Sequence, residues 1–600
     1  MLKRFMVLLV AVIFLLGGCG NQSIDSSNNS NEKNQSVDII LEKHSNENLI
    51  KDIDFLIKTI EEVHPNAYAY LDKETFYKEV NEIKSKINRP MNSIEFYKEI
   101  APLVSLLKDG HTNVFIPKDL FAEFLISTGK KQFPLVIEIR NNKIFNKKSM
   151  NKEIDIPIGA EILSINDIET ERIVKDLKKY ETGMKDQYKE VKLERDFYFL
   201  SWLGYQFSDE YKLTYKYEDN VSTIVTDGVS KDKLDSYLKR MYSYTTNYNY
   251  EIFDDKICYL DFNSFSDYSS FEKLLERMFK EINEKNIEKL IIDIRDNGGG
   301  NSRLGDILIS YIYDKPFYLF SRTDVKISKQ IIERDNWGDV SQIGETVTYD
   351  GSPIYNSDME NRFNGRICVL TNRYTFSSAA DFAVTIKDFN IGRLIGEETG
   401  GLATCYGDVY HFSLPNSNLN CGVSYKYFVR PNKDEASNGV TPHHEVKQRL
   451  DDLASNNDTV LDFAKEYIIH DYDKENSSLD SKIVNIDFCE VDGEDKGKLV
   501  SRSENLYKSF FDNDYDSIEV VLSNELKKWL TKDKLIKINS DLSSEVGDLK
   551  LVSVTKVNAL KIDNKVREYN VEGTIDFEKG NLSFSITFDE NKKILNIYTE

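Results

Sequence analysis

Two adjacent serines, Ser377 and Ser378, stand where the sequence predicts a turn from a buried strand into a helix. The apolar run Ile367–Leu370 precedes this turn, and apolar residues at helical spacing, such as Phe382 and Ile386, follow it. A serine in such a turn exposes its hydroxyl beside the free N–H groups of a helix N-terminus. An activated nucleophile with part of an oxyanion hole requires this arrangement. The alternative is that Ser377 only caps the helix.

Two further stretches contain the residue types that a serine nucleophile needs. His111 lies in the segment Asp109–Thr112 (DGHT), and a side chain that titrates near neutral pH suits a general base. The segment Asp296–Gly300 (DNGGG) follows a buried strand, and its glycines let the backbone approach a substrate with no Cβ in the way. Taken alone, the histidine fits a solvated loop and the glycines fit a flexible one. The chemical interpretation therefore depends on the three stretches together.

The three stretches occur in a diagnostic order: DGHT at 109–112, DIRDNGGG at 293–300 and TFSSAAD at 375–381. In this order they resemble the S41 serine peptidases, which include the tail-specific and the tricorn-like proteases. The resemblance covers roughly residues 45 to 450. It implies a ClpP/crotonase-like core, hydrolysis of peptide bonds in a polypeptide substrate, and no metal or cofactor.

The resemblance also implies a role for single residues. The family pattern Ser-Ala-x-Glu falls on Ser378–Asp381, with aspartate where glutamate is usual. Ser378 is therefore the predicted nucleophile, and Ser377 is its neighbour. The N–H of Gly298 or Gly299, together with that of Ala379, is expected to form the oxyanion hole.

The identity of the base separates the branches of this family. Tail-specific proteases use a lysine a little beyond a Gly-Glu-x-Thr segment, and Leu402 occupies that position here. This disfavours a Ser–Lys dyad and favours His111, because the tricorn-like branch uses a histidine. A carboxylate should orient the imidazole. Glu435 is the predicted one, with Glu445 and Asp109 as alternatives.

Hydrophobic periodicity predicts an α/β fold in several parts. Residues 45–125 read as an N-terminal helical cap, and 246–470, where strands and helices alternate, read as the peptidase core. Between them, 126–245 is a β-rich spacer. Its Gly-x-x-Ile-x-x-Ile-Asn pattern at 159–166 resembles PDZ-type modules, which capture a peptide at an exposed sheet edge, although an ordinary β-rich spacer remains the alternative. Residues 488–600 resemble the α+β NTF2-like domains (DUF3887-like) of bacterial lipoproteins, and this part is read as a binding or spacing module.

The N-terminus carries an export signal. Two basic residues precede the apolar run Phe5–Leu16, which is shorter than the ~20 residues of a spanning helix, and two glycines and Cys19 follow. This pattern resembles the bacterial lipobox. It predicts a signal peptide over residues 1–18, lipidation of Cys19 and a flexible tether over 19–44. The protein is then expected outside the cytoplasm, anchored to the cell membrane, and a plain signal peptide is the alternative.

Composition and charge disfavour some classes of function. With 600 residues and a formal net charge of -22, the chain is expected to form several domains and to repel nucleic acid. The five cysteines after Cys19 show no CxxC spacing, so they do not indicate a metal site, and pairing of Cys405 with Cys421 stays open. The prediction is a membrane-tethered serine endopeptidase of exported polypeptides. The alternative is a catalytically inactive lipoprotein with the S41 fold that binds peptides or cell-wall components.

Overall fold

The structure is a computed structural model. It describes residues 42–242, 247–335, 338–355, 359–455, 457–475, 483–562 and 564–599. The predicted signal peptide and Cys19, with nearly all of the predicted tether, lie outside the described residues. No helix in the described segments combines the length and the apolarity that crossing a membrane requires.

The first part of the described chain is helical because apolar side chains recur at helical spacing. In its first helix Leu49, Ile53 and Leu56 share one face and are buried. On the same helix the buried Asp52 accepts hydrogen bonds from the backbone N–H groups of Asn416 and Ser417, at 3.0 and 2.8 Å. These bonds attach the helix to a hairpin turn encoded far downstream. The elements are α2 (Asn46–Val63), α3 (Lys73–Lys86), α4 (Ser93–Ser105), β1 (Asn113–Val114) and α5 (Lys118–Thr128).

The helical part packs against a sheet whose strands, apart from β1, come from later in the chain. Its order is β1-β16-β11-β12, and β15 also pairs with β16. Asn113 of β1 pairs with Gly422 of β16, which fixes the histidine segment just before β1 against this sheet. The later elements are β11 (Arg322–Lys326), α11 (Lys329–Asp335), the 3-10 helix η2 (Val340–Gln342), β12 (Thr346–Asp350), β15 (Cys405–Ser413) and β16 (Asn420–Val429).

The spacer is a twisted antiparallel sheet with helices on it. Its order is β2-β3-β4-β6-β7, with β5 paired to β4. Buried and more exposed residues alternate at the start of β3 and of β6, which agrees with a sheet covered on one face. The elements are β2 (Leu135–Arg140), β3 (Lys143–Ser149), β4 (Glu161–Ile165), β5 (Ile168–Glu169), α6 (Thr170–Leu177), η1 (Lys178–Tyr180), α7 (Asp186–Tyr205), β6 (Glu210–Tyr217), β7 (Asn220–Asp227) and α8 (Lys231–Tyr242).

The core is a sheet of order β17-β14-β13-β10-β9-β8, in which β9, β10, β13, β14 and β17 are parallel and β8 is antiparallel to β9. Its strands are apolar on both faces, because α9, α10 and α12 cover one face and α14 covers the other. The elements are β8 (Tyr248–Ile252), β9 (Ile257–Phe262), α9 (Tyr268–Glu284), β10 (Lys289–Asp293), α10 (Arg303–Ile312), β13 (Arg366–Thr371), α12 (Ser378–Asp388), β14 (Arg393–Gly396), β17 (His444–Glu445), α13 (Leu450–Ala454), α14 (Thr459–His470) and η3 (Tyr472–Glu475).

The C-terminal part is an antiparallel sheet of order β18-β19-β20-β21-β22 packed against a layer of helices. It contacts the core: the N–H of Val484 donates to the carbonyl of Asp388 at 3.0 Å, and Phe488 stacks on Tyr355. The elements are β18 (Ile486–Glu490), α15 (Gly493–Phe511), α16 (Tyr515–Val521), α17 (Asn524–Trp529), α18 (Lys532–Val546), β19 (Leu549–Ile562), β20 (Lys565–Phe577), β21 (Gly580–Asp589) and β22 (Ile594–Thr599).

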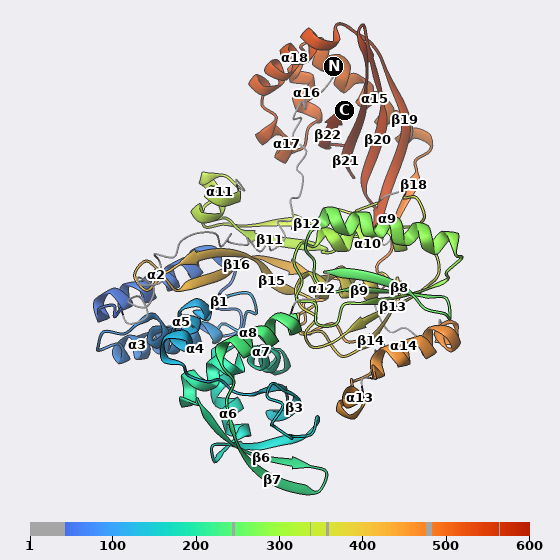
Figure 1. The fold of residues 1–600 in the computed structure, drawn as a ribbon. Coiled ribbons are helices and arrows are strands. Elements are labelled where there is room, and N and C mark those ends of the chain that lie inside the picture. Colours follow the sequence, from blue (N-terminus) through green and yellow to red (C-terminus); the bar gives the residue numbers. More distant parts are fainter. Residues whose placement is uncertain are drawn as a thin grey trace.

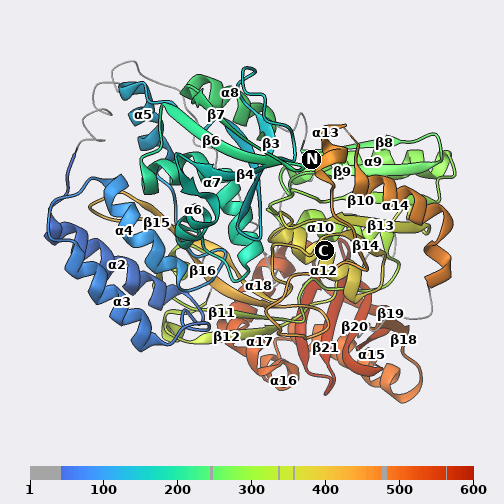
Figure 2. The ribbon, with the colours of Figure 1, turned by 90° about the horizontal axis from the view of Figure 1, so that it is seen from below.

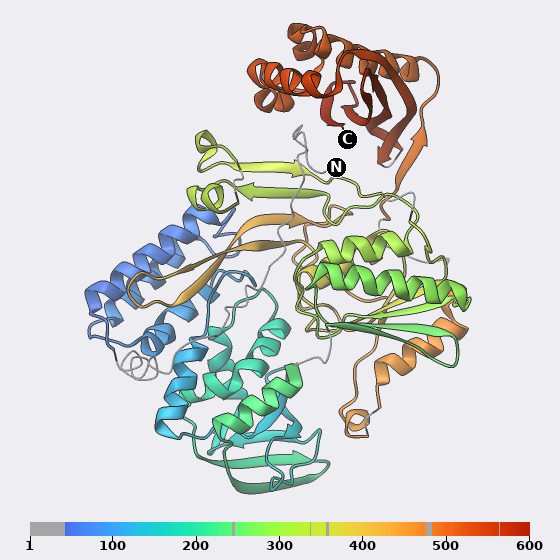
Figure 3. The ribbon, with the colours of Figure 1, turned by 45° about the horizontal axis from the view of Figure 1, so that its top comes forward.

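The N-terminal helices, the spacer and the core lie beside one another in the view of Figure 1, and the C-terminal part lies above them. Seen from below, the spacer sits between the N-terminal helices and the core (Figure 2). A third view separates the C-terminal sheet from the remaining parts (Figure 3). The predicted fold class, an α/β peptidase core with a helical cap, a β-rich spacer and a C-terminal α+β part, is confirmed.

Candidate active site

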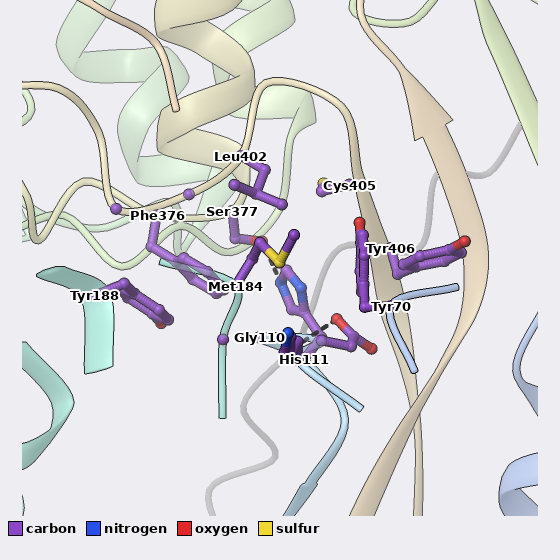
Figure 4. Close-up of a pocket in the computed structure, with 15 residues that line it drawn as sticks. Tyr70, Gly110, His111, Met184, Tyr188, Phe376, Ser377, Leu402, Cys405 and Tyr406 are labelled. Carbon is purple, nitrogen blue, oxygen red and sulfur yellow. Dashed lines mark hydrogen bonds between the residues drawn. The ribbon is translucent and has the colours of Figure 1, made fainter. Parts of the chain in front are cut away.

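Ser377 stands at the turn between β13 and α12. It is the residue before the first helical residue, and its backbone has φ 54° and ψ -133°, which is strained for a residue with a Cβ. Its side chain makes no capping hydrogen bond to the helix. The hydroxyl faces the imidazole of His111 instead, with 3.2 Å between Ser377 Oγ and His111 Nε2 (Figure 4). The turn therefore presents a serine hydroxyl to a base, and the capping alternative does not hold.

Ser378 does not occupy the predicted position. It is the first residue of α12, and its hydroxyl donates to the carbonyl oxygen of Gly300 at 2.7 Å. Its side chain is buried, and within the described residues the serine that contacts His111 is Ser377. The assignment of Ser378 as the serine that meets the base is therefore wrong. The physical reason is the helix start: the exposed, strained position falls one residue before the first helical residue.

His111 is held by its own loop and by the β15 strand. Its backbone N–H donates to Asp109 Oδ1 at 3.0 Å, and the backbone carbonyl of Tyr406 lies near enough to the ring to favour its protonated form. Burial lowers the pKa of His111, and the negative charges of Asp109 and Asp408 only partly oppose this. The imidazole is therefore neutral at pH 7 and able to accept a proton.

Asp109, one of the alternatives for the orienting carboxylate, lies in the same loop as His111 and accepts its backbone N–H. It is buried, and it accepts hydrogen bonds from the hydroxyls of Thr112 and Ser424. His64 Nε2 lies 3.3 Å from Asp109 Oδ2, and both side chains are almost completely buried. Burial acts to raise the pKa of Asp109, but these partners and the nearby His111 outweigh it and hold the pKa below its usual range. A fixed carboxylate thus supports the histidine loop.

Glu435 does not take the predicted role. Its half-exposed carboxylate accepts hydrogen bonds from Arg322 at 3.1 Å and from the Tyr427 hydroxyl at 3.3 Å. The other alternative, Glu445, pairs with Lys447 and is also exposed. The prediction that Glu435 orients the imidazole is wrong, because its local sequence carries no information about which strand its side chain meets after folding.

The loop of residues 296–300, here called the glycine loop, lies next to the turn that carries Ser377, here called the nucleophile turn. The two are neighbours because β10 and β13 are adjacent parallel strands. Their carboxyl ends meet at one edge of the sheet, where ligands bind in open α/β sheets. Asn297 joins the two loops: it is fully buried, its carbonyl accepts the N–H of Phe376 at 3.0 Å, and its side chain donates to the carbonyl of Phe262 at 2.7 Å. At Gly299, with φ 89°, an added Cβ would lie 2.8 Å from both the Ser377 Cβ and the Ser378 nitrogen. Only glycine leaves the space beside Ser377 open.

The structure revises the predicted oxyanion donors. The N–H of Gly299 donates to Asn297 Oδ1 at 2.9 Å, and the N–H of Ala379 donates to the Phe376 carbonyl at 3.2 Å, so both are already engaged. By contrast, the N–H groups of Gly298 and Ser378 have no acceptor among the described residues. Gly298 stays a candidate, and Ser378 enters through its backbone, since it directly follows the serine that faces the base.

The spacer reaches the nucleophile turn through α7. The ring of Tyr188 stacks on that of Phe376, with centroids 4.4 Å apart and planes 8° apart, and Phe376 in turn lies 4.6 Å from the His111 ring. At Gly110 an added Cβ would lie 3.2 Å from the Phe376 ring, so the glycine before the histidine permits this packing. Phe376 is thus fixed between a spacer residue and the candidate base.

A buried ionic cluster makes a second connection between the spacer and this turn. Glu194 of α7 accepts hydrogen bonds from Arg373, from the Tyr374 hydroxyl and from the N–H of Ile139 in β2. Arg373 also donates to the carbonyl of Ile139 at 2.6 Å. The edge of β2 is therefore occupied inside the molecule. The expectation of a free sheet edge for peptide capture, as in PDZ-type modules, is not met at this strand.

Two hollows lie on either side of the Ser377–His111 pair. The first, of about 420 Å³, is rich in aromatic and apolar side chains and is called the aromatic pocket; it is drawn in Figure 4. Its lining includes Tyr70, Met184, Tyr188, Phe376, Leu402 and Tyr406. The second, of about 380 Å³, is called the acidic slot. Its lining includes Ser302, Phe320, Asp381, Cys405, Asp408 and Phe428.

The sequence interpretation missed three features of the site. Ser377 was not chosen because the family pattern Ser-Ala-x-Glu falls on Ser378, one residue later in the chain. His64 was not singled out, because no motif surrounds it and only the proline that follows it marks a turn. Asp408 lies in a strand whose pairing decides that it faces the slot. Cys405 and Cys421 are both free thiols, so they do not pair with each other.

Comparison with protein families gives two matches. Residues 256–446 match the model of peptidase family S41, and this range contains the glycine loop and the nucleophile turn. Residues 503–597 match a family described as a protein of unknown function, DUF3887, as predicted for the C-terminal part.

Comparison with solved structures agrees with the fold. A crystal structure of a CPAF mutant is similar with a TM-score of 0.54 and 15% identity, over 72% of this chain and 99% of that one. The structure of mature CPAF is similar with a TM-score of 0.52, at the same identity and coverage. At this level of identity the likeness establishes a shared fold. The likeness extends well beyond the length of residues 256–446, since it covers 72% of this chain.

Proposed function

We propose that the protein is an active serine endopeptidase of peptidase family S41, whose model matches residues 256–446, with Ser377 as its nucleophile and His111 as its base. The observation that carries the proposal is the 3.2 Å separation of Ser377 Oγ and His111 Nε2. A separation of this size allows proton transfer within a hydrogen bond. The hydroxyl also lies on a strained turn at a helix N-terminus, as nucleophilic serines do in other hydrolases.

The chemistry follows from these positions. His111 Nε2 takes the proton of the Ser377 hydroxyl while Oγ attacks the carbonyl carbon of the scissile peptide bond. The N–H groups of Ser378 and Gly298 are placed to donate to the developing oxyanion. The C–N bond then breaks, and the leaving amine receives the proton from His111. Water, deprotonated by His111, hydrolyses the acyl-enzyme and restores the serine hydroxyl.

Supporting residues keep the base in the required state. The Tyr406 carbonyl lies near the ring, and a proton on the nitrogen that faces away from Ser377 would leave Nε2 as an acceptor in the neutral form. The imidazolium formed during attack lies near Asp109 and Asp408, whose negative charges stabilise it. Among the described residues no carboxylate contacts the ring directly, so orientation rests on the backbone carbonyl and on the histidine loop.

The test is covalent labelling with a fluorophosphonate, which reacts with activated serines. We expect labelling of the wild-type protein, loss of labelling in Ser377→Ala, and labelling within about tenfold of wild type in Ser378→Ala, because that change removes one hydrogen bond worth about 1 kcal/mol. Ser378→Ala is the matched control, since it removes the neighbouring hydroxyl. Labelling that survives in Ser377→Ala but not in Ser378→Ala would assign the nucleophile to Ser378. Absence of labelling in the wild type would favour a peptide-binding protein without turnover.

The proposal also includes the cellular location of the enzyme. An apolar run followed by Gly17, Gly18 and Cys19 supports export and attachment to the cell membrane through a lipid on Cys19. Exported polypeptides are then the substrate class that the enzyme meets.

A further inference from the structure

The acidic slot contains one carboxyl group without a partner. Asp381, on the first turn of α12, is 8% exposed, and its Oδ1 is buried. Within the described chain no residue donates a hydrogen bond to it. The other acid of the slot, Asp408, is paired with the buried Lys426, whose Nζ lies 2.6 Å from Asp408 Oδ2. Of the two acids in the slot, Asp381 is therefore the one without a hydrogen-bond donor or a paired cation among the described residues.

A buried polar group without a partner costs roughly 1–3 kcal/mol, and most such groups in folded proteins are satisfied. Burial and the negative charge of Asp408 raise the pKa of Asp381 well above its usual range, which favours the neutral form while the slot contains no cation. No lysine or arginine of the described residues lines the slot. A lysine or arginine partner for Asp381 would therefore come from a bound molecule.

The walls of the slot indicate what kind of donor fits. Phe320 and Phe428 stack with centroids 4.3 Å apart and form an apolar wall. Asp381 supplies the acid inside the slot, and Ser302 adds a polar group. A side chain with an apolar stem and a cationic end satisfies both the wall and the acid, and lysine and arginine have this form.

The position of the slot assigns it to one side of the scissile bond. Gly300 and Ser378 line it, so it adjoins the loop and the helix turn whose N–H groups are placed for the oxyanion. The aromatic pocket is lined by Gly110 and Lys108 of the histidine loop, on the side where the leaving amine takes its proton from His111. The residue whose carbonyl is attacked therefore has its side chain nearest the slot.

We propose that the acidic slot is the S1 subsite of the enzyme and that it selects lysine or arginine at P1 through Asp381. This inference rests on the proposed function, because it names the substrate class of the same site. The ammonium or guanidinium group would lower the pKa of Asp381, so that the carboxyl releases its proton to solvent and accepts a hydrogen bond from the cation as a carboxylate, while the methylene stem lies along Phe320 and Phe428.

Two peptide diphenyl phosphonates that differ only in the P1 side chain, lysine or norleucine, test the proposal. In the reaction a bond forms between Ser377 Oγ and phosphorus, and phenol leaves with the proton that His111 accepted. We expect the wild type to be inactivated at least about tenfold faster by the lysine probe, since a charge-assisted hydrogen bond is worth about 1.5–3 kcal/mol. In Asp381→Asn the ratio of the two rates should fall to about one.

The ratio of rates within one enzyme cancels any general loss of reactivity. Asp314→Asn, at an exposed position, is the control and should keep the wild-type ratio. Thermal unfolding checks that Asp381→Asn is folded, as expected for an isosteric replacement of a neutral carboxyl. Equal rates for the two probes in the wild type, or a lysine preference that survives in Asp381→Asn, would overturn the S1 assignment. Either result with normal fluorophosphonate labelling leaves the proposed function intact, whereas loss of all labelling rejects that function itself.

Discussion

At the scale of single residues, the site depends on a strained serine that its surroundings hold in place. A residue with a Cβ at the backbone angles of Ser377 costs about 1–3 kcal/mol. Hydrogen bonds on both sides compensate: the Phe376 N–H donates to Asn297, the Gly401 N–H donates to the Thr375 carbonyl, and the Ala380 N–H donates to the Ser377 carbonyl at 2.7 Å. The hydroxyl therefore cannot relax into a helix cap, and it stays directed at His111.

The pH dependence of activity belongs to this scale. Peptide hydrolysis requires neutral His111, so kcat/KM should fall as the pH is lowered through the pKa of that residue. Because burial lowers this pKa below its ordinary value of about 6.5, the acidic limb should lie below pH 6.5. A pH–rate profile of kcat/KM with an uncharged peptide substrate measures it. An acidic limb centred above the ordinary histidine value would contradict the role of His111, and His111→Ala should remove the limb together with most of the rate.

At the scale of elements, helix α7 acts as a brace for the nucleophile turn. One turn of α7 supplies Tyr188, which stacks on Phe376, and a later turn supplies Glu194, which binds Arg373 and Tyr374. The side chains of Arg373 and Glu194 are 3% and 4% exposed, so their charges are paired within the protein. Strand β2 completes the brace through both backbone groups of Ile139. The spacer therefore helps to position the serine.

Glu194→Ala should disturb the turn. Removing one partner of a buried ion pair costs about 3–5 kcal/mol, and only Glu138, 3.7 Å away, would remain as a carboxylate beside Arg373. We expect a lower Tm and a kcat at least tenfold lower with little change in KM, about 1.4 kcal/mol or more in the barrier. Glu194→Gln keeps one acceptor and should recover part of the kcat. Kinetics well below the Tm and fluorophosphonate labelling rates provide the measurement.

Glu171→Ala, on the exposed side of the neighbouring helix α6, is the control for that experiment and should match the wild type. If Glu194→Ala lowers the Tm while its kcat at low temperature stays at the wild-type value, the cluster stabilises the fold without positioning the serine.

At the scale of the whole molecule, the site exists only where three parts meet. The N-terminal part supplies His111, the spacer supplies Tyr188 and Glu194, and the core supplies Ser377 and the glycine loop. The sheet that contains β16 connects the N-terminal part to the core, since β1 pairs with β16. The C-terminal part contacts the core at Val484 and Phe488, on segments outside both hollows.

Membrane attachment is a prediction at this scale. In a bacterial host the wild-type protein should appear in the membrane fraction and incorporate labelled palmitate, because Cys19 is expected to carry the lipid anchor. Cys19→Ser should lose the lipid and shift to the soluble fraction or the medium. Ser23→Ala, in the predicted tether, is the matched control and should stay in the membrane fraction. A Cys19→Ser protein that remains membrane-bound would reject the anchor.

The sequence by itself determined the class of fold and the chemical groups. Local periodicity specifies helices and strands, and the order of DGHT, DIRDNGGG and TFSSAAD predicted the family whose model matches residues 256–446 and the histidine that faces Ser377. Those patterns are local, so they survive without knowledge of the fold. Tertiary structure alone decided which of two serines faces His111, because the answer depends on where α12 begins relative to β13. It also decided that Glu435 points to the surface and that Asp381 is left without a partner among the described residues, because burial and pairing arise from segments far apart in the chain.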